Sequence, residues 1–109
     1  MALKANIVID QGTTFQTSIN VTDDNDDVVD LTGYSALAQM RKHYTSSNAT
    51  SFLASISPSI GVVTLSMNAT TTNTITAGRY VYDCELTDTN GAVTRIVEGI
   101  VTVTPGVTR

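Results

Sequence analysis

The sequence predicts an all-β protein, folded as one antiparallel β-sandwich domain over residues 1–109. Thr, Val, Ser and Ile supply close to half of the chain, and β-branched side chains fit a pleated sheet better than a helix. Short segments of alternating apolar and polar residues recur along the chain, and turn residues separate them. Because no segment shows a clear helical period, these observations favour a sandwich over a parallel sheet covered by helices.

The first part of the chain predicts two strands, over residues 4–10 and 13–21, with a break at Gln11-Gly12. The acidic stretch 23–27 predicts a hairpin turn, and a short strand over residues 28–31 follows it. The residues expected to share one face in the first two strands are Ala5, Ile7 and Ile9, then Phe15, Thr17, Ile19 and Val21.

A longer strand is predicted over residues 34–44, after a break at Thr32-Gly33. Ala36, Ala38 and Met40 point to one face, where small side chains allow two sheets to pack closely. The residues expected on the opposite, polar face are Gln39, Arg41 and His43.

Two further strands are predicted in the middle of the chain. Residues 45–50 are rich in Ser, Thr and Asn and predict an exposed loop, residues 58–61 predict a turn, and the Thr-rich residues 68–76 predict another loop. The inward-facing residues of the two strands are Phe52, Ala54 and Ile56, then Val63, Leu65 and Met67.

The last two strands form a predicted hairpin around residues 88–91. With Asn90-Gly91 as a two-residue loop, Tyr82 lies opposite Gly99. An aromatic ring that covers a strand glycine stabilises such a site, so we expect Gly99 to be close-packed or bulged. Pro105 ends the pairing. The inward-facing residues of the first strand of this hairpin are Tyr80, Tyr82, Cys84 and Leu86. The second strand, which runs back beside it, contains Val93, Val97, Val101 and Val103.

The entry into this hairpin, residues 77–82, resembles the tyrosine corner of immunoglobulin-like sandwiches, in which a tyrosine hydroxyl satisfies upstream backbone. Tyr80 takes the corner position, and Tyr82 takes the core position where antibody domains place a cysteine. The antibody cysteine pair and core tryptophan are missing. The pattern refines the fold prediction to an immunoglobulin-like antiparallel β-sandwich of seven to nine strands, with Tyr80 as a structural residue.

The charge balance argues against nucleic-acid partners, because six Lys and Arg face ten Asp and Glu and the net charge is −4. No apolar run approaches the roughly 20 residues of a membrane span, and residues 1–6 lack the apolar block of a secretory signal. Cys84 is the only cysteine and closes no internal disulfide. We therefore expect a soluble, non-exported chain with no membrane partner.

Catalytic chemistry finds little support in the sequence. His43 is the only histidine and lies on the predicted polar face beside Arg41, while Cys84 alternates with buried residues as a small hydrophobe. No nucleophile, base and orienting group can be assembled from these residues. The sequence thus predicts a protein that is not an enzyme, with no catalytic residue, no cofactor site and no catalytic metal.

The acidic loop 23–27 has two possible roles, a solvated turn or a calcium site. Asp23, Asn25 and Asp27 have the alternate spacing of an EF-hand loop, but Val28 stands where that loop needs glycine, and no glutamate follows at the required distance. We expect a solvated turn here, with calcium binding as the alternative.

The order of several short motifs resembles a known family. Asp30-Leu31-Thr32-Gly33-Tyr34, followed by Ala36 and Arg41, is similar to the D-L-T-G-Y…R segment of phage baseplate upper proteins and related tail and fibre attachment domains. The resemblance spans nearly the whole chain and implies a structural role without catalysis. Its further parts are Gly61 with Thr64-Leu65, Gly78-x-Tyr80-x-Tyr82-Asp83, and Gly99 through Val103-Thr104-Pro105 with Val107-Thr108-Arg109.

From this resemblance we expect a virion protein of a tailed bacteriophage, assembled in the host cytoplasm in many symmetric copies whose partners are other virion proteins. The expected role is an adaptor that joins the tail or baseplate to fibres. Larger family members continue into further domains, whereas this chain stops at Arg109, so a decoration protein of the capsid surface is the alternative. A carbohydrate-binding or adhesin-type module is the second alternative, with Tyr44 as its candidate contact residue.

The motif residues also have plain structural roles in this prediction. Thr32-Gly33 forms a backbone turn, Asp30 caps that turn, and Arg41 pairs with an acidic neighbour such as Asp83. No contact site is assigned to any of them.

Overall fold

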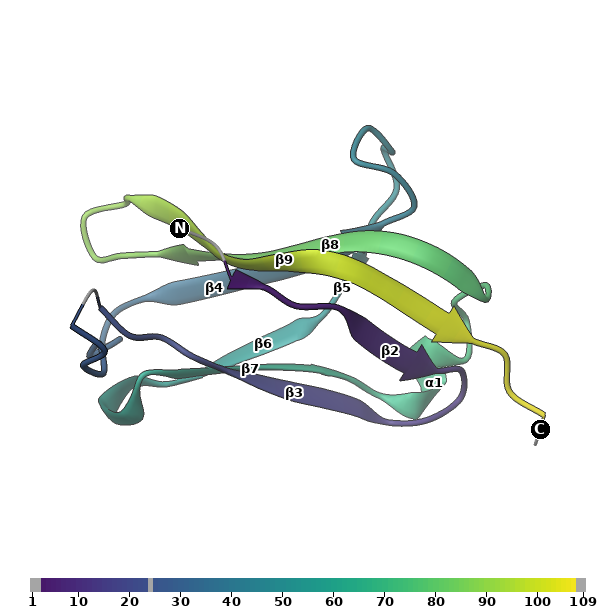
Figure 1. Cartoon of the computed structure of the whole chain (residues 1–109), viewed down its shortest axis with the longest axis horizontal. Coiled ribbons are helices and arrows are strands. Elements are labelled where there is room, and N and C mark those ends of the chain that lie inside the picture. Colours follow the sequence, from purple (N-terminus) through teal and green to yellow (C-terminus); the bar gives the residue numbers. More distant parts are fainter. Residues whose placement is uncertain (1–2, 24, 108–109) are drawn as a thin grey trace.

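The computed structural model of the protein describes residues 3–23 and 25–107. These residues form nine strands in two facing sheets, which confirms the all-β prediction, and they include one short helix (Figure 1). The six-stranded sheet has the order β1-β9-β8-β4-β5, with β2 also paired to β9, and the three-stranded sheet has the order β3-β7-β6. The bounds of the first are β1 Leu3–Lys4, β2 Ile7–Asp10, β4 Ser35–Arg41, β5 Thr50–Ser51, β8 Gly78–Thr87 and β9 Val93–Thr104, and those of the second are β3 Phe15–Asn20, β6 Leu53–Ser57 and β7 Val62–Met67.

The six-stranded sheet is mixed, so the prediction of a purely antiparallel sandwich is wrong. Both β1 and β2 run parallel to β9, with Ile7 opposite Val101 and Ile9 opposite Val103. β8 takes one edge of β9 through the last hairpin, which leaves the other edge for the start of the chain. After β2 the chain turns at Gly12, where φ is 83°, and enters the other sheet as β3.

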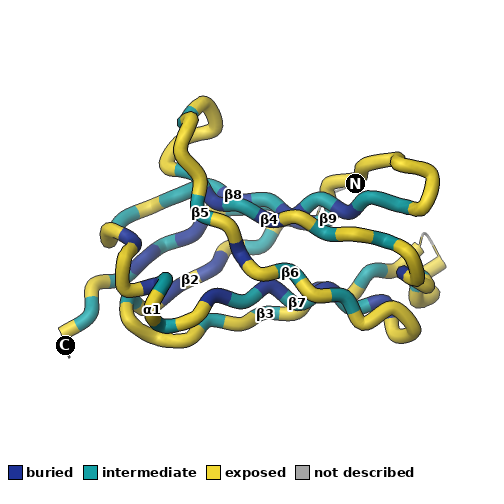
Figure 2. Tube along the Cα trace, turned by 180° about the vertical axis from the view of Figure 1, so that it is seen from behind, coloured by how far each residue is buried: buried dark blue, intermediate teal, exposed yellow. Residues whose placement is uncertain are grey.

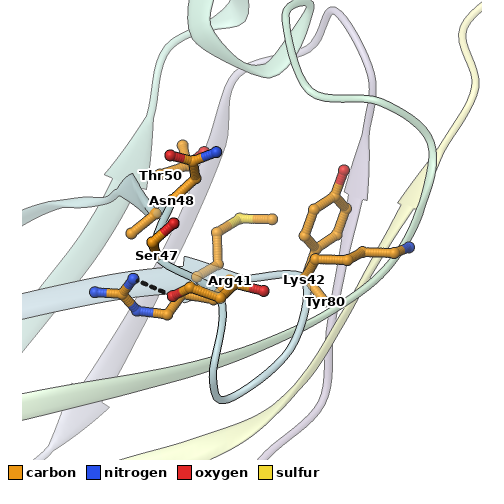
Figure 3. A pocket seen from close by; sticks show the side chains of 9 residues that line it. Arg41, Lys42, Ser47, Asn48, Thr50 and Tyr80 are labelled. Atoms are coloured by element: carbon orange, nitrogen blue, oxygen red, sulfur yellow. Dashed lines mark hydrogen bonds between the residues drawn. The ribbon is translucent and has the colours of Figure 1, made fainter.

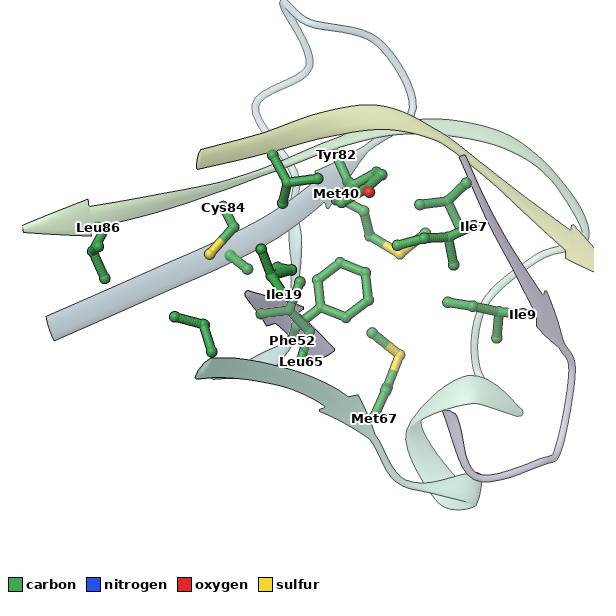
Figure 4. Close-up of a cluster of buried hydrophobic side chains, with 14 of the residues drawn as sticks. Ile7, Ile9, Ile19, Met40, Phe52, Leu65, Met67, Tyr82, Cys84 and Leu86 are labelled. Carbon is green, nitrogen blue, oxygen red and sulfur yellow. The ribbon is translucent and has the colours of Figure 1, made fainter. Parts of the chain in front are cut away.

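The predicted alternation of inward residues is confirmed for most of the residues named, because the two sheets enclose one apolar core (Figures 2 and 4). Val93 is an exception: it precedes the irregularity in the β8–β9 ladder and is exposed, unlike Val97. Phe52 lies where the chain passes from β5 in one sheet to β6 in the other. Its N–H donates to the carbonyl oxygen of Ala38 at 3.0 Å, and its ring centroid lies 6.0 Å from that of Phe15 and 6.1 Å from that of Tyr82. The buried apolar residues are Ile7, Ile9, Ile19, Leu31, Ala38, Met40, Phe52, Val63, Leu65, Met67, Ile75, Tyr82, Cys84, Leu86, Val97, Val101 and Val103.

The last hairpin corrects one prediction and confirms another. Thr87 pairs with Val93, so residues 88–92 form the loop and the two-residue loop at Asn90-Gly91 is wrong. The carboxylate of Asp88 accepts the N–H groups of Asn90 and Ala92 and holds this wider turn. An irregularity between Cys84 and Glu85 then shifts the register by one residue, which brings Tyr82 opposite Gly99 as predicted.

Gly99 is close-packed, as expected, but against backbone. A Cβ atom at this position would meet the carbonyl group of Ala5, with its carbon only 2.8 Å away. Between β1 and β2 the chain leaves the ladder, yet Ala5 N–H still donates to the carbonyl oxygen of Glu98, and the Tyr82 hydroxyl donates to that of Ala5 at 2.6 Å. The glycine therefore lets the first strands close over β9.

Two local predictions in the loops are wrong. Residues 28–31 form no strand, because only an isolated bridge joins Thr22 to Val28 and the rest of the segment follows the turn that buries Leu31. Residues 68–76 contain the helix α1 (Ala69–Thr72), which Asn68 caps by accepting the N–H of Thr71. Among the described residues, no helix is long and apolar enough to cross a membrane.

The expected turns at residues 58–61 and after β9 are confirmed. Pro58–Ile60 is a short 3-10 helix that ends at Gly61 with φ 63°, and β9 ends at Thr104, directly before Pro105. These turns set the lengths of β6, β7 and β9.

Candidate functional site

The turn at residues 30–34 is structural, as predicted. The Asp30 carboxylate accepts the Thr32 N–H at 3.0 Å and the Thr32 hydroxyl at 2.6 Å. Gly33 has φ 81°, and Tyr34 N–H donates to the carbonyl oxygen of Leu31. The hydrogen bond from the Thr32 side chain lowers the pKa of Asp30, followed by the bond from the Thr32 backbone. This segment thus shapes the entry into β4.

The predicted pairing of Arg41 with Asp83 is wrong. The Arg41 guanidinium donates to the carbonyl oxygen of Ser46 at 2.7 Å and to the side chain of Gln39 at 3.2 Å. Asp83 instead pairs with Arg95, whose Nε lies 3.1 Å from its carboxylate. The β4–β8 register explains the difference, because it places Asp83 opposite Gln39 and Arg41 opposite Val81.

The connection between β4 and β5, residues 42–49, projects from the sandwich (Figure 1). The Arg41 guanidinium joins Ser46 of this loop to the end of β4, and the Ser46 hydroxyl accepts the N–H of His43. On one flank this loop borders a hollow of about 370 Å³, and Lys42 Nζ lies 4.9 Å from the ring centre of Tyr80 at its rim (Figure 3). The hollow is lined by Met40, Arg41, Lys42, Ser46, Ser47, Asn48, Ala49, Thr50 and Tyr80.

A second hollow, of about 200 Å³, lies on the outer face of the six-stranded sheet beside Tyr44. The Tyr44 side chain is exposed, with a relative exposure of 81%, as expected for a contact residue. The strand predicted over residues 34–44 ends at Arg41, so Tyr44 lies on the projecting loop. Arg95 lies between Asp83 and Glu98, with its Nη1 3.7 Å from the Glu98 carboxylate. An aromatic ring beside planar charged side chains offers the stacking and hydrogen bonds that a sugar ring needs.

The sequence did not single out Arg95, Lys42 or Asn48 for these hollows. The register of the last hairpin brings Arg95 beside Asp83, and that register depends on a bulge. No sequence signal pointed to Arg95, because residues three apart face opposite sides of a regular strand, and only the bulge turns Arg95 and Glu98 to the same face.

Tyr80 makes the contact with upstream backbone that was predicted for it. The Tyr80 hydroxyl donates to the carbonyl oxygen of Thr76 at 2.6 Å, four residues upstream, as the motif predicts. Tyr82 is buried two residues later, and burial raises its pKa to about 12, with a smaller contribution from Cys84. Both tyrosines therefore join β8 to neighbouring backbone through their hydroxyl groups.

The remaining candidate groups also have structural surroundings. Cys84 is fully buried, and burial raises the pKa of its thiol to about 11, followed by the nearby charges of Asp83 and Glu85. His43 is exposed on the projecting loop. In the acidic loop, a carboxylate oxygen of Asp23 accepts the N–H groups of Asn25 and Asp27, as in a solvated turn. Across residues 3–23 and 25–107, no three His, Cys, Asp or Glu side chains gather closely enough to hold a metal ion.

Comparison with known proteins adds no family to this geometry. No protein-family model matches the chain, and no curated protein sequence matches it.

Proposed function

We propose that the two-sheet fold is an immunoglobulin-like sandwich. The order β3-β7-β6 corresponds to strands B, E and D of that fold, and β9-β8-β4 corresponds to G, F and C. The hydroxyl bond of Tyr80 lies near the start of β8, the strand that carries the tyrosine corner in this correspondence. The strand order and this contact support the proposal independently.

We further propose that the protein is a non-enzymatic structural protein of a tailed-phage virion, an adaptor that joins the tail or baseplate to fibres. The observation that carries the proposal is what the resembling segments do. Asp30 caps a turn, Gly61 ends the 3-10 helix, Tyr80 forms the corner contact and Gly99 admits the backbone of Ala5. Each segment contributes to the scaffold, as expected if the family resemblance reflects a shared structural module.

The surroundings of the reactive side chains also support a non-catalytic role. The Cys84 thiol has a raised pKa inside the core, while His43 lies on an exposed loop. A thiolate nucleophile needs a lowered pKa and a nearby base. Neither residue is therefore prepared for nucleophilic catalysis.

Immunogold electron microscopy of purified phage particles tests the adaptor role, with an antibody raised against this chain. We expect label at the tail end. Label confined to the head would reject the tail role in favour of capsid decoration, and unlabelled particles that also lack the chain by mass spectrometry would reject the virion role.

Carbohydrate binding is a second candidate, because Tyr44 lies exposed beside Arg95 and Asp83 in the 200 Å³ hollow. A glycan array with the purified chain tests it. If the candidate holds, Tyr44→Ala abolishes binding and His43→Ala, at the adjacent exposed position outside this hollow, retains it. Binding that survives Tyr44→Ala, or no binding to any glycan, would count against this candidate.

A further inference from the structure

The strand β3 forms an open edge of the three-stranded sheet. It pairs with β7 over its whole length, from Phe15 opposite Met67 to Asn20 opposite Val62, without a bulge. In the described part of the chain it has no strand on its other side. Figure 1 shows β3 in front of β7 and β6, on the same side of the sandwich as β2. An edge of this kind presents a row of unpaired backbone groups.

The usual protections of an edge strand are missing from β3. Its sequence, Phe-Gln-Thr-Ser-Ile-Asn, contains no proline and no charged residue. The other edges of the molecule differ. β1 and β2 carry Lys4 and Asp10, and β5 has only two residues. β6 is also uncharged, but it is shorter than β3 and its start is tied to β4 through the bond from Phe52 N–H to Ala38. β3 is therefore the edge most open to another strand.

The unpaired groups of β3 can be assigned from the ladder. Val21 N–H donates to the carbonyl oxygen of Gly61 at 2.7 Å, which continues the β3–β7 register by one pair. Because backbone groups alternate sides along a strand, the groups of Gln16, Ser18 and Asn20 point to the open edge. Their side chains are exposed on the outer face.

We propose that β3 pairs antiparallel with β3 of a second copy, about a two-fold axis at Ser18. In this register Ser18 faces Ser18, and Gln16 faces Asn20 of the second copy. Each pair exchanges N–H and carbonyl bonds, and the amide side chains of Gln16 and Asn20 form cross-strand pairs. A two-fold axis places the same strand opposite itself, so a charged residue near the axis would meet a like charge. β3 contains no charged residue and avoids this repulsion.

A hollow behind this edge supports the same occupant. It has a volume of about 270 Å³ and lies between β3 and the first strands, with Leu65, Tyr82 and Val97 also in its lining. Its lining contains no charged side chain. In the proposed register, Thr17 faces Ile19 of the second copy on this inward side, so the strand of the second copy lies along the rim of the hollow.

The inference goes beyond the proposed virion role and rests on the edge geometry alone. Analytical ultracentrifugation of the purified chain tests it, because the expected species has twice the mass of one chain. Ser18→Lys places two like charges directly opposite each other and is expected to raise the dissociation constant of the dimer at least roughly tenfold. Ser55→Lys is the matched control, since Ser55 is also an exposed serine of the same sheet but lies on β6. It is expected to leave the dimer intact.

A second variant tests the register without a new charge. Under oxidation Ser18→Cys is expected to form a disulfide-linked dimer, because facing residues of such a pair lie about 5.5 Å apart at their Cα atoms, within disulfide range. Ser55→Cys is expected not to crosslink, and the native Cys84 is buried. A parent chain that stays monomeric at millimolar concentration would overturn the proposal, as would a dimer that Ser55→Lys dissociates and Ser18→Lys does not. Neither result would change where the chain lies in particles, so the virion role is tested separately.

Discussion

The two sheets of the sandwich differ in the charge of their strands and in how their edge strands are covered. The strands of the three-stranded sheet, as described, contain no charged side chain, and their outer face is built mainly from Ser, Thr, Gln and Asn. The six-stranded sheet carries all the charged residues that lie in described strands. These residues are Lys4, Asp10, Arg41, Arg79, Asp83, Glu85, Arg95 and Glu98.

The edges follow the same division. The free edge of β9 is covered by β1 and β2, and the cover is locked where Ala5 meets Gly99 and the Tyr82 hydroxyl. The edge of β3 has no such cover among the described residues. Since proteins protect the edges that must not pair, the difference teaches that β9 is covered by its own chain whereas β3 is left available.

The largest expected effect is at the covered edge. Gly99→Val should lower the free energy of unfolding by about 3 kcal/mol, because the new side chain cannot fit beside the backbone of Ala5. Ser18→Val, the matched change at the open edge, should cost less than about 0.5 kcal/mol. Urea denaturation measures both. Equal losses would remove the distinction between the edges.

High pH should lower the stability of the six-stranded sheet, because Tyr82 and Cys84 are buried on β8. Burial raises the pKa of Tyr82 from 10.0 to about 12 and that of Cys84 from 9.0 to about 11. Well below pH 9 both groups keep their protons in both states and contribute no pH dependence. As pH rises above 9, the unfolded chain loses protons that the folded chain retains, so stability falls between about pH 9 and 12. Denaturation curves across this range should show a shallower fall for Cys84→Ala and for Tyr82→Phe.

The corner contact should have a smaller effect. Tyr80→Phe removes the hydroxyl bond to Thr76 and should lower the free energy of unfolding by about 1 kcal/mol. Tyr44→Phe is the control, because that side chain is exposed on the projecting loop. If thermal unfolding shows the two variants to be equally stable, the corner contact contributes nothing to the six-stranded sheet.

The smallest effect is expected in the turn that leads into β4. Hydrogen bonds from Thr32 lower the pKa of Asp30, so its contribution to stability is present above its ordinary pKa of 3.8 and is lost as pH falls through the lowered value. A carboxyl NMR titration should find the Asp30 pKa below 3.8, and Thr32→Val should move it upward. An unchanged pKa in that variant would contradict the role of the hydroxyl.

The parts of the fold that local alternation determines could be predicted from the sequence. Val63, Leu65 and Met67 face the core because side chains alternate along any strand, whichever strand lies beside it. The turns at Gly33 and Gly61 followed from residue type, because both need positive φ. The helix after Asn68 could have been anticipated from its capping residue, but one turn of helix has no period to detect.

What depended on distant partners could not be predicted in this way. The parallel pairing of β2 with β9 joins residues from opposite ends of the chain, and no local pattern records the choice. The partner of Arg41 depended on the β4–β8 register, and the Tyr44 hollow depended on a bulge that brings Arg95 to Asp83. Of the residues that line the hollow beside Tyr44, the sequence identified only Tyr44 as a candidate contact residue.

The parallel arrangement of β2 and β9 has a mechanical consequence. Ile7 to Asp10 pair with Val101 to Thr104 in the same direction, and the described chain begins on the side of the molecule opposite to the end at which it finishes (Figure 1). A force that pulls these ends apart runs along both strands in opposite senses, so it loads the hydrogen bonds between them in shear. All of those bonds must then yield together, whereas a hairpin pulled from its open end breaks one bond at a time. A chain with this geometry resists tension along its long axis.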